Sequence, residues 1–229
     1  MDFQVIRDNL DYLLRGHWPD GPLGGAALTL LLSVGSAVLS GALGLALGIA
    51  LAMSAPRVRV ALTAAIGFFR AIPVLMLIFW TYFLLPIAFG IDVPGVFSVM
   101  CALSLVGGAY LAHSVRAGIA SIGAGQWQAG LSLGLTRFAT LRHVVLPQAL
   151  RIMLPSFVNQ WVSLVKDTSL AYVVGVGELS FLAAQVNART MIHPAEVFLF
   201  VGAIYFVLCS ALDLLARLLA RRCRSGAGV

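Results

Sequence analysis

Apolar residues form long runs that short polar stretches separate, the pattern of a chain that crosses a membrane several times. The first run predicts a span over residues 27–53. The next, residues 60–91, contains Arg70 as its single charge and is longer than one straight span needs. We expect Pro73 and Pro86 to divide it, with Pro73 kinking the helix because proline removes a backbone donor.

A third span is predicted over about 96–115, after a short external loop at 88–95. The apolar run 152–165 is shorter than a full span, so its polar end, 166–169, is expected to lie at membrane depth. Residues 170–188 are apolar but broken by glycines and Glu178. They predict a short or re-entrant element that lines protein or water.

The last span is predicted over 197–219, which makes five. Gly44 and Gly48 in the first span form a pair of small residues four apart, which lets helix backbones approach closely in lipid. Such pairs are common in membrane helices, and we favour general packing here over a specific dimer motif.

Composition excludes most other classes. Of 229 residues, 60% are hydrophobic and only 10% charged, against roughly 25% charged in an average soluble domain. The mean hydropathy is +0.97. A soluble fold, a disordered chain and a disulfide scaffold are all excluded, the last because three cysteines make no framework. We expect an all-α polytopic membrane bundle: an external polar segment over 1–26, one transmembrane domain over 27–220 and a basic tail over 221–229.

The few charges predict the orientation. The first 20 residues contain more acids than bases, and arginines gather at the other end. Positive charge accumulates on the cytoplasmic side, so the N-terminus is expected outside and the C-terminus inside. The net charge of +6 does not indicate nucleic-acid binding, since the arginines lie between apolar runs. The acidic, polar start does not resemble a cleavable signal, so the first span is expected to be retained.

No catalytic motif is visible. The four histidines have no metal-ligand spacing with each other or with cysteine. There is no nucleophile elbow and no phosphate-binding loop ending in Lys-Ser/Thr. We therefore expect no enzyme activity, no metal and no bound cofactor, and any ATP to be bound by another chain.

The segment that follows the third span is polar and lies on the predicted cytoplasmic side. Residues 126–133 can form a short helix that Gly134 ends in the role of a C-cap, and Pro147 can restart a helix in its first turn. Apolar residues are expected to pin the neighbouring turn: Leu133, Leu135, Phe138 and Leu141. Such a helix would be a docking projection, or alternatively an interfacial helix lying on lipid.

This segment, with its glycine and closing Leu-Pro, resembles the cytoplasmic "EAA" loop of permease subunits of ATP-binding-cassette (ABC) importers. Three further stretches resemble the polar amino-acid branch of that family: 69–73, then 108–112 with 116–119, and finally 159–160 with 166–170. The resemblance implies a coupling loop over 119–147. Its ATPase-contacting residues would be Gln126, Trp127, Gln128, Ala129, Gly130, Leu133, Gly134 and Arg137, with Pro73 and Pro147 in structural roles.

The family resemblance further implies a type I ABC importer permease fold in the bacterial inner membrane. The permease would pair with a second permease subunit, itself or a paralogue, on a dimer of ABC ATPase subunits that binds ATP and Mg. A solute-binding protein outside would deliver the substrate. ATP binding would turn the permease outward and hydrolysis would reset it, so this chain supplies a gated path.

Three positions depart from the family pattern. Gln128 replaces the glutamate that names the loop, Gly130 replaces its second alanine, and His113 follows Ala112 where the family has glutamate. Gln128 keeps hydrogen-bonding capacity but no charge. Docking is therefore expected to depend on shape and apolar contact.

Charged residues within spans are costly and usually face a bundle interior or a water path. Arg70, Lys166 and Asp167 are the candidates, and one fixed cation with one fixed anion would suit a zwitterionic amino acid. The polar residues around them complete the predicted substrate path: Asn159, Gln160, Ser163, Thr168 and Ser169. Alternatively, Lys166 and Asp167 pair with neighbouring segments and hold the fold, while Arg70 lies at a lipid headgroup.

The stretch 69–80 is most similar to permeases of glutamate/aspartate importers, where Arg70 would match a side-chain carboxylate. The binding protein could instead select the substrate. The rival classes are an ATP-independent secondary amino-acid carrier or channel, and a membrane-embedded enzyme. Secondary carriers often show paired inverted repeats, and the predicted spans do not divide in that way.

Overall fold

The computed structural model describes residues 4–90, 93–190 and 194–225, with side chains to residue 218. Asp92 of the predicted external loop and the side chains of the predicted basic tail, 221–229, lie outside these residues. The described part is helical and contains no strand, with isolated bridges between Gly16 and Leu23 and between Gly25 and Glu178. This confirms the all-α prediction.

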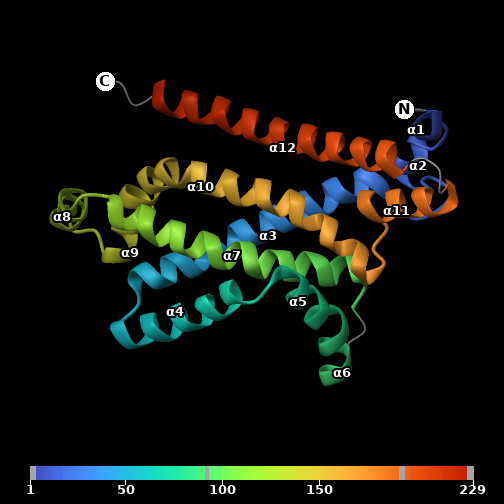
Figure 1. Ribbon diagram of the computed structural model, residues 1–229. Coiled ribbons are helices and arrows are strands. Elements are labelled where there is room, and N and C mark those ends of the chain that lie inside the picture. Colours follow the sequence, from blue (N-terminus) through green and yellow to red (C-terminus); the bar gives the residue numbers. More distant parts are fainter. Residues whose placement is uncertain (1–3, 91–92, 191–193, 226–229) are drawn as a thin grey trace. The chain divides into compact units, whose positions relative to one another are not determined.

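Figure 1 labels the α-helices along the chain. In order, the elements are α1 Gln4–Asp8, α2 Leu10–Arg15, α3 Gly25–Met53, α4 Pro56–Ala71, α5 Val74–Phe79, the π-helical turn η1 Trp80–Leu84, α6 Leu85–Phe89, α7 Gly95–Ser121, α8 Ala124–Ser132, α9 Arg137–Thr140, the π-helical turn η2 Leu141–Val145, α10 Leu146–Asp167, the 3₁₀ helix η3 Thr168–Val174, α11 Leu179–Thr190 and α12 Pro194–Ser225.

The chain forms two compact units, and α3, α7, α10 and α12 contribute residues to both. Unit 1 comprises residues 1–38, 72–104 and 161–212. Unit 2 comprises residues 39–71, 105–160 and 213–229.

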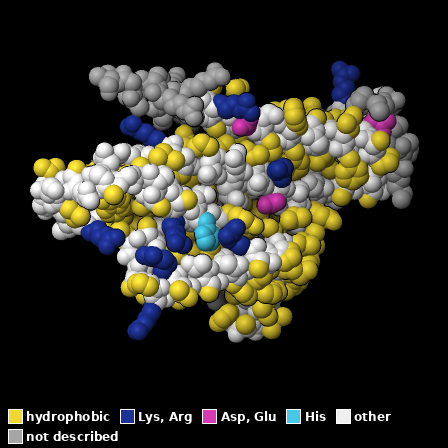
Figure 2. All heavy atoms as spheres, turned by 60° about the vertical axis from the view of Figure 1, so that its left-hand side comes forward, with side chains coloured by type: hydrophobic (Ala, Val, Ile, Leu, Met, Phe, Trp, Pro, Cys, Tyr) yellow, Lys and Arg dark blue, Asp and Glu magenta, His cyan; other side chains and the backbone are white. Residues whose placement is uncertain are grey.

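Three of the described helices, α3, α7 and α12, are long and apolar enough to cross a membrane, and α4 with α5–α6 makes a fourth if that bent pair is one span. The predicted count of five exceeds this by one. The difference is α10, which has 22 residues but is more polar. At 1.5 Å per residue it is long enough to cross, so the short run predicted over 152–165 underestimated the helix. Figure 2 shows hydrophobic side chains over much of the visible face and far fewer charged ones.

Pro73 breaks the second apolar run rather than kinking it. Helix α4 ends at Ala71 and α5 begins at Val74. Pro73 stands before α5 with an extended ψ of 136°, and a residue that precedes proline, here Ile72, is disfavoured in helical conformation. Pro86 does not divide the run. It lies in the first turn of α6, directly after η1.

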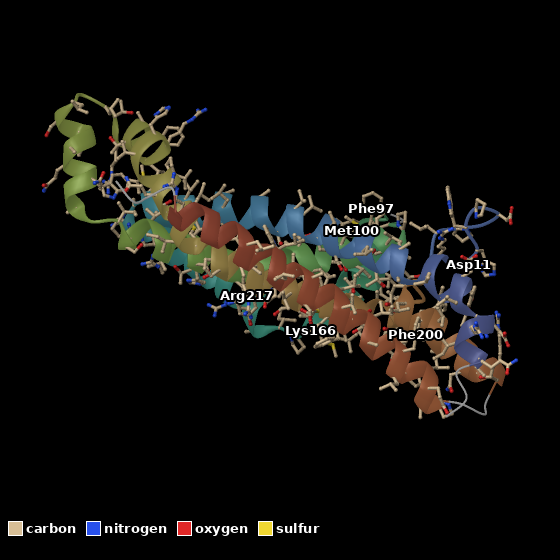
Figure 3. The ribbon with its side chains drawn as sticks, turned by 90° about the horizontal axis from the view of Figure 1, so that it is seen from above. Asp11, Phe97, Met100, Lys166, Phe200 and Arg217 are labelled. Atoms are coloured by element: carbon tan, nitrogen blue, oxygen red, sulfur yellow. The ribbon has the colours of Figure 1, made fainter. Side chains whose placement is uncertain are left out.

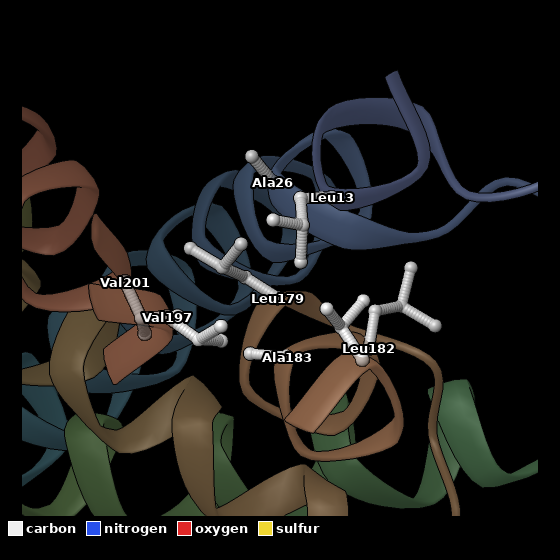
Figure 4. Packing of buried hydrophobic residues seen from close by; sticks show 8 residues of the cluster. Leu13, Ala26, Leu179, Leu182, Ala183, Val197 and Val201 are labelled. Atoms are coloured by element: carbon white, nitrogen blue, oxygen red, sulfur yellow. The ribbon is translucent and has the colours of Figure 1, made fainter. Parts of the chain in front are cut away.

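A cluster of buried side chains holds the N-terminal helices of unit 1 to its C-terminal ones (Figure 4). Leu13 of α2 and Ala26 of α3 meet residues of α11 and α12 there. The other buried members are Leu179, Leu182, Ala183, Val186, Val197 and Val201. The segment predicted only as polar, 1–26, thus contains helices that are packed into the core of unit 1.

In unit 2, small residues set the approach of α3 to α7. A Cβ built on Gly44 would lie 2.4 Å from the Cβ of Leu111, and one on Gly48 would lie 2.4 Å from the Cβ of Val115. From the other side, a Cβ on Gly108 would lie 2.7 Å from Leu43 Cδ2. The pair of small residues therefore packs helices within the chain, as general packing predicts.

Candidate coupling and transport sites

The predicted docking helix is present as α8. It begins two residues earlier than predicted and ends one residue earlier, at Ser132. Gly134 follows with a positive φ of 77°. Its N–H donates to Leu131 O at 2.9 Å, and the N–H of Leu135 donates to Gly130 O at 3.2 Å. This pair of bonds is a Schellman ending, in which glycine adopts the left-handed conformation without a Cβ penalty, and it confirms the role predicted for Gly134.

The glycine at position 130 has a local cause. Gly130 is buried, and a Cβ built on it would lie 2.5 Å from Thr140 Cγ2. Helices α8 and α9 are therefore so close at this point that the alanine of the family pattern does not fit without a shift. Thr140 is fully buried and its Oγ1 donates to Thr136 O at 3.0 Å, which fixes the side chain in place.

Thr136 caps the start of α9, since its Oγ1 accepts from the N–H of Ala139 at 3.2 Å. The chain then passes through the wide turn η2, where the N–H of Leu146 donates to Leu141 O, five residues back. Pro147 lies in the first turn of α10, as predicted, but a π-helical turn precedes it rather than a loop. A wide turn suits this place because proline has no N–H to donate and its ring crowds the carbonyl four residues back.

Two contacts join α8 to the elements behind it. Nε2 of Gln148 donates to Oε1 of Gln126 at 3.3 Å, and the guanidinium of Arg137 lies 6.0 Å from the Trp127 ring centroid. Four predicted coupling residues, Gln126, Trp127, Gly130 and Arg137, therefore take part in contacts of α8 with α9 or α10 within this chain.

Apolar side chains stand out from this loop. Leu131, Leu133 and Phe138 have exposed fractions of 48%, 80% and 60%. The prediction that Leu133 and Phe138 pin the neighbouring turn was wrong. The buried leucine there is Leu141, which is 1% exposed. Gln128 and Ala129 are also exposed, so the outer surface of the loop combines apolar and uncharged polar groups.

Arg70 lies near the end of α4 and belongs to unit 2. Its guanidinium carbon stands 4.8 Å from the centroid of the Tyr110 ring on α7, a cation–π distance. Gln160 and Asn159 also belong to unit 2. Asn159 lines a cavity of about 140 Å³ together with Asp213 and Arg217, whose side chains form an ion pair at 2.7 Å.

The remaining path residues lie in unit 1, where α10 ends and η3 begins. Lys166 is exposed (Figure 3) and Asp167 half-buried, and neither forms an ion pair with another described side chain. Thr168 has no exposed surface and donates to Val165 O at 2.7 Å, and Ser169 donates to Lys166 O at 2.7 Å. These two hydroxyls therefore serve the helix end, whereas the two charged side chains are available to other groups.

Sequence reasoning missed the role of Glu178, which it treated only as an interruption of an apolar stretch. Glu178 has no exposed surface. Its two carboxylate oxygens accept from the N–H groups of Ser180 and Phe181, each at 2.9 Å, which caps α11. Oε2 also accepts from the hydroxyl of Tyr205 at 2.9 Å. An acid directly before a helix within an apolar stretch was the available signal.

These features define a class: a multi-pass helical membrane protein with an apolar projection on one connecting loop. The chain belongs to the family of binding-protein-dependent transport system inner membrane components, whose model matches residues 44–225.

Curated relatives are similar over nearly the whole chain. The glutamine transport system permease protein GlnP of Escherichia coli is 35% identical and covers 90% of this chain and 94% of its own length. The glutamate/aspartate import permease protein GltK of Escherichia coli is 33% identical over 96% of this chain and 97% of its own length. The L-cystine transport system permease protein TcyB of Bacillus subtilis is 32% identical over 93% of this chain and 90% of its own length.

Solved structures agree. A crystal structure of an amino acid ABC transporter with histidines contains a chain that is 26% identical, with a TM-score of 0.82. The match covers 97% of this chain and 99% of that one. An inward-facing structure of the MetNI methionine ABC transporter, 21% identical with a TM-score of 0.75, shares the fold. The predicted type I permease fold and inner-membrane location are therefore confirmed, and the chain is an amino-acid ABC importer permease.

Proposed function

We propose that this permease moves a polar amino acid that an external solute-binding protein delivers, and that α8 with its Gly134 ending couples it to a separate ATPase subunit. The observation that carries the proposal is the exposed apolar surface of the loop, Leu131, Leu133 and Phe138. Large apolar side chains that gather on an exposed connecting loop indicate an interaction site.

The absence of a charged residue at position 128 fits this mode of docking. Gln128 is exposed and can exchange hydrogen bonds with a partner, but it forms no ion pair. Contact with the ATPase then depends on the three apolar side chains and on the shape that the Schellman ending gives the loop.

The chemistry of ATP belongs to the partner in this proposal. This sequence contains no phosphate-binding loop ending in Lys-Ser/Thr, so ATP and Mg would be bound by the ATPase dimer. The permease pair would contribute the gated path, and no enzyme activity is assigned to this chain.

We favour glutamate or aspartate as the substrate. Arg70 is the residue in the second apolar run that can bind a side-chain carboxylate with two parallel hydrogen bonds. Its stacking on Tyr110 at 4.8 Å holds the guanidinium in one place. The named relatives carry different amino acids, glutamine, L-cystine and glutamate/aspartate, so sequence similarity alone does not select among them.

The test is a substrate screen of the intact complex in proteoliposomes, measuring ATPase stimulation and uptake with the binding protein and each candidate amino acid. We expect stimulation by one or a few polar amino acids, glutamate and aspartate first. Uptake that continues without ATP or without the ATPase subunit would overturn the proposal in favour of a secondary carrier.

The substrate assignment is tested separately by Arg70→Gln, with Arg57→Gln as the matched control. Arg57 is an exposed arginine at the other end of α4. Glutamate uptake is expected to fall in the Arg70 variant and to be unchanged in the control. Equal uptake by both variants would remove Arg70 from the substrate path.

A further inference from the structure

Unit 2 contains a marked excess of positive charge. Residues 39–71 and 105–160 carry no Asp, Glu or Lys, but they carry seven arginines: Arg57, Arg59, Arg70, Arg116, Arg137, Arg142 and Arg151. The remaining segment of the unit contains one acid, Asp213, which is already paired with Arg217 at 2.7 Å. The carboxylates of this unit therefore cannot neutralise its arginines.

Three of these arginines line one cavity. The cavity has a volume of about 280 Å³ and receives Arg59 from α4, Arg116 from α7 and Arg137 from α9. Its other walls are apolar or aromatic and come from the ends of α3 and α7, from the residue that follows α7 and from α8. They are Leu51, Ala52, Ile119, Ala120, Ile122 and Trp127. Three positive groups thus meet around a cavity with no negative group in its wall.

One nitrogen of the Arg59 side chain has no hydrogen-bond acceptor at this cavity in the part of the chain that the structure describes. Its Nη2 donates to Ser54 O at 3.0 Å, but its Nε is buried and has no hydrogen-bond partner among the described residues. A buried donor without an acceptor is costly. An acceptor entering the cavity would satisfy it, and guanidinium groups match the oxygens of phosphate particularly well.

We propose that this cavity binds the phosphate group of an anionic phospholipid. The inference rests on the proposed function, since coupling of α8 to the ATPase would place this end of the helices on the cytoplasmic side. Leu51 and Ala52 are near the last residue of the membrane-spanning helix α3, and Ile119 and Ala120 near the last residue of α7. The cavity therefore lies at the level where acyl chains give way to headgroups. Basic pockets between helices on the cytoplasmic side are suited to anionic headgroups.

The position of the cavity gives the lipid a role. Trp127 of α8 and Arg137 of α9 form part of its wall, and both belong to the predicted coupling loop. A phosphate held by Arg59, Arg116 and Arg137 would join the ends of α3, α4 and α7 to that loop. Coupling of ATP hydrolysis to uptake is then expected to depend on anionic lipid.

The experiment uses the complete complex in nanodiscs of phosphatidylcholine alone or mixed with phosphatidylglycerol, with bound lipid counted by native mass spectrometry. The variant is Arg59→Gln with Arg116→Gln, and Arg57→Gln is the matched control, an arginine of α4 like Arg59 that does not line the cavity. We expect phosphatidylglycerol retention to fall roughly fivefold for one substitution and about thirtyfold for both, with no change in the control. Arg59→Lys with Arg116→Lys tests folding, since it keeps both charges and should retain part of the binding.

Three results would overturn the proposal. Equal lipid retention by the double variant and the Arg57→Gln control would show that the cavity binds no lipid. Saturable binding of inorganic phosphate in phosphatidylcholine nanodiscs, with no preference for phosphatidylglycerol, would assign the site to a soluble anion. Ion pairs between these arginines and carboxylates of the ATPase subunit, seen in a structure of the complex, would assign the arginines to that protein. The readout is lipid count, so a complex that fails to transport amino acids can still pass this test.

Discussion

The hydroxyl of Tyr205 on α12 donates a 2.9 Å hydrogen bond to Oε2 of Glu178, a carboxylate with no exposed surface. Because the same carboxylate caps α11, this bond joins the start of one helix to the middle of another. Thr29 of α3 completes the arrangement, since its Oγ1 accepts from the N–H of Leu179 at 3.1 Å. Three helices of unit 1 thus meet through polar groups at one buried place.

Tyr205→Phe is expected to destabilise unit 1 by about 1 kcal/mol, the net contribution of a typical hydrogen bond. Glu178→Ala should cost more, because it leaves the N–H groups of Ser180 and Phe181 without acceptors. Thermal unfolding of the purified complex measures both. Tyr172→Phe is the control, since Tyr172 is 50% exposed. A midpoint that moves equally for Tyr205→Phe and the control would contradict the role given to the Tyr205 bond.

Gly134→Ala is expected to uncouple transport. An L-residue in this left-handed conformation costs roughly 1–2 kcal/mol, so the end of α8 should loosen. Uptake by the reconstituted complex should fall several-fold while ATP hydrolysis persists. Gly125→Ala is the matched control, because a Cβ at either glycine meets nothing within 4 Å and only Gly134 has a positive φ. Normal uptake by Gly134→Ala would count against the coupling assignment.

Gly48→Ala is expected to destabilise unit 2. The added Cβ would lie 2.8 Å from Ala112 O and closer still to Val115, and overpacking of this kind costs typically about 1–3 kcal/mol. The yield of folded protein and its thermal midpoint should both drop. Gly67→Ala adds the same atom where nothing lies within 4 Å, so that control should be neutral or slightly stabilising. Equal yields and thermal midpoints for Gly48→Ala and Gly67→Ala would contradict the close packing of α3 on α7.

Lys166→Ala and Asp167→Ala are expected to lower uptake while leaving assembly with the ATPase intact. Neither side chain forms an ion pair with a described partner, so little folding energy depends on them. A lost charge-assisted contact to substrate, about 1.5–3 kcal/mol, corresponds to at least a tenfold loss of uptake. Asp11→Ala, on an exposed side of α2, controls for removal of charge. Normal uptake by either variant would show that its residue has a structural role and does not belong to the substrate path.

The structure of the loop that contains α8 was predictable from sequence because its signals are local. A glycine that ends a short helix and a proline that follows are read within a few positions, and α8 with Gly134 confirms them. The exposure of Leu133 and Phe138 was not predictable, because it depends on which side of the loop Thr140 and Leu141 occupy. The Gly130–Thr140 contact likewise arises from the packing of two helices.

The long-range contacts were beyond sequence reasoning. Glu178 and Thr29 are 149 positions apart, and no periodicity relates them. The extent of α10 was missed for a different reason: residues 146–151 are too polar to be read as part of a span, yet they continue its helix. Charge scarcity did identify Arg70, Lys166 and Asp167 as the residues to test, and their role in transport stays a prediction.

The wide turn η2 also fixes a direction. A π-helical turn holds one residue more than an α-helical turn, and each residue of an α-helix advances the chain by about 100° around its axis. Removing one residue from Leu141–Val145 would therefore rotate α9 and the neighbouring α8 by about 100° around α10. The exposed side chains of the loop would be unchanged but would face in another direction. The extra residue in η2 therefore sets the direction in which the proposed docking surface, Leu131, Leu133 and Phe138, faces.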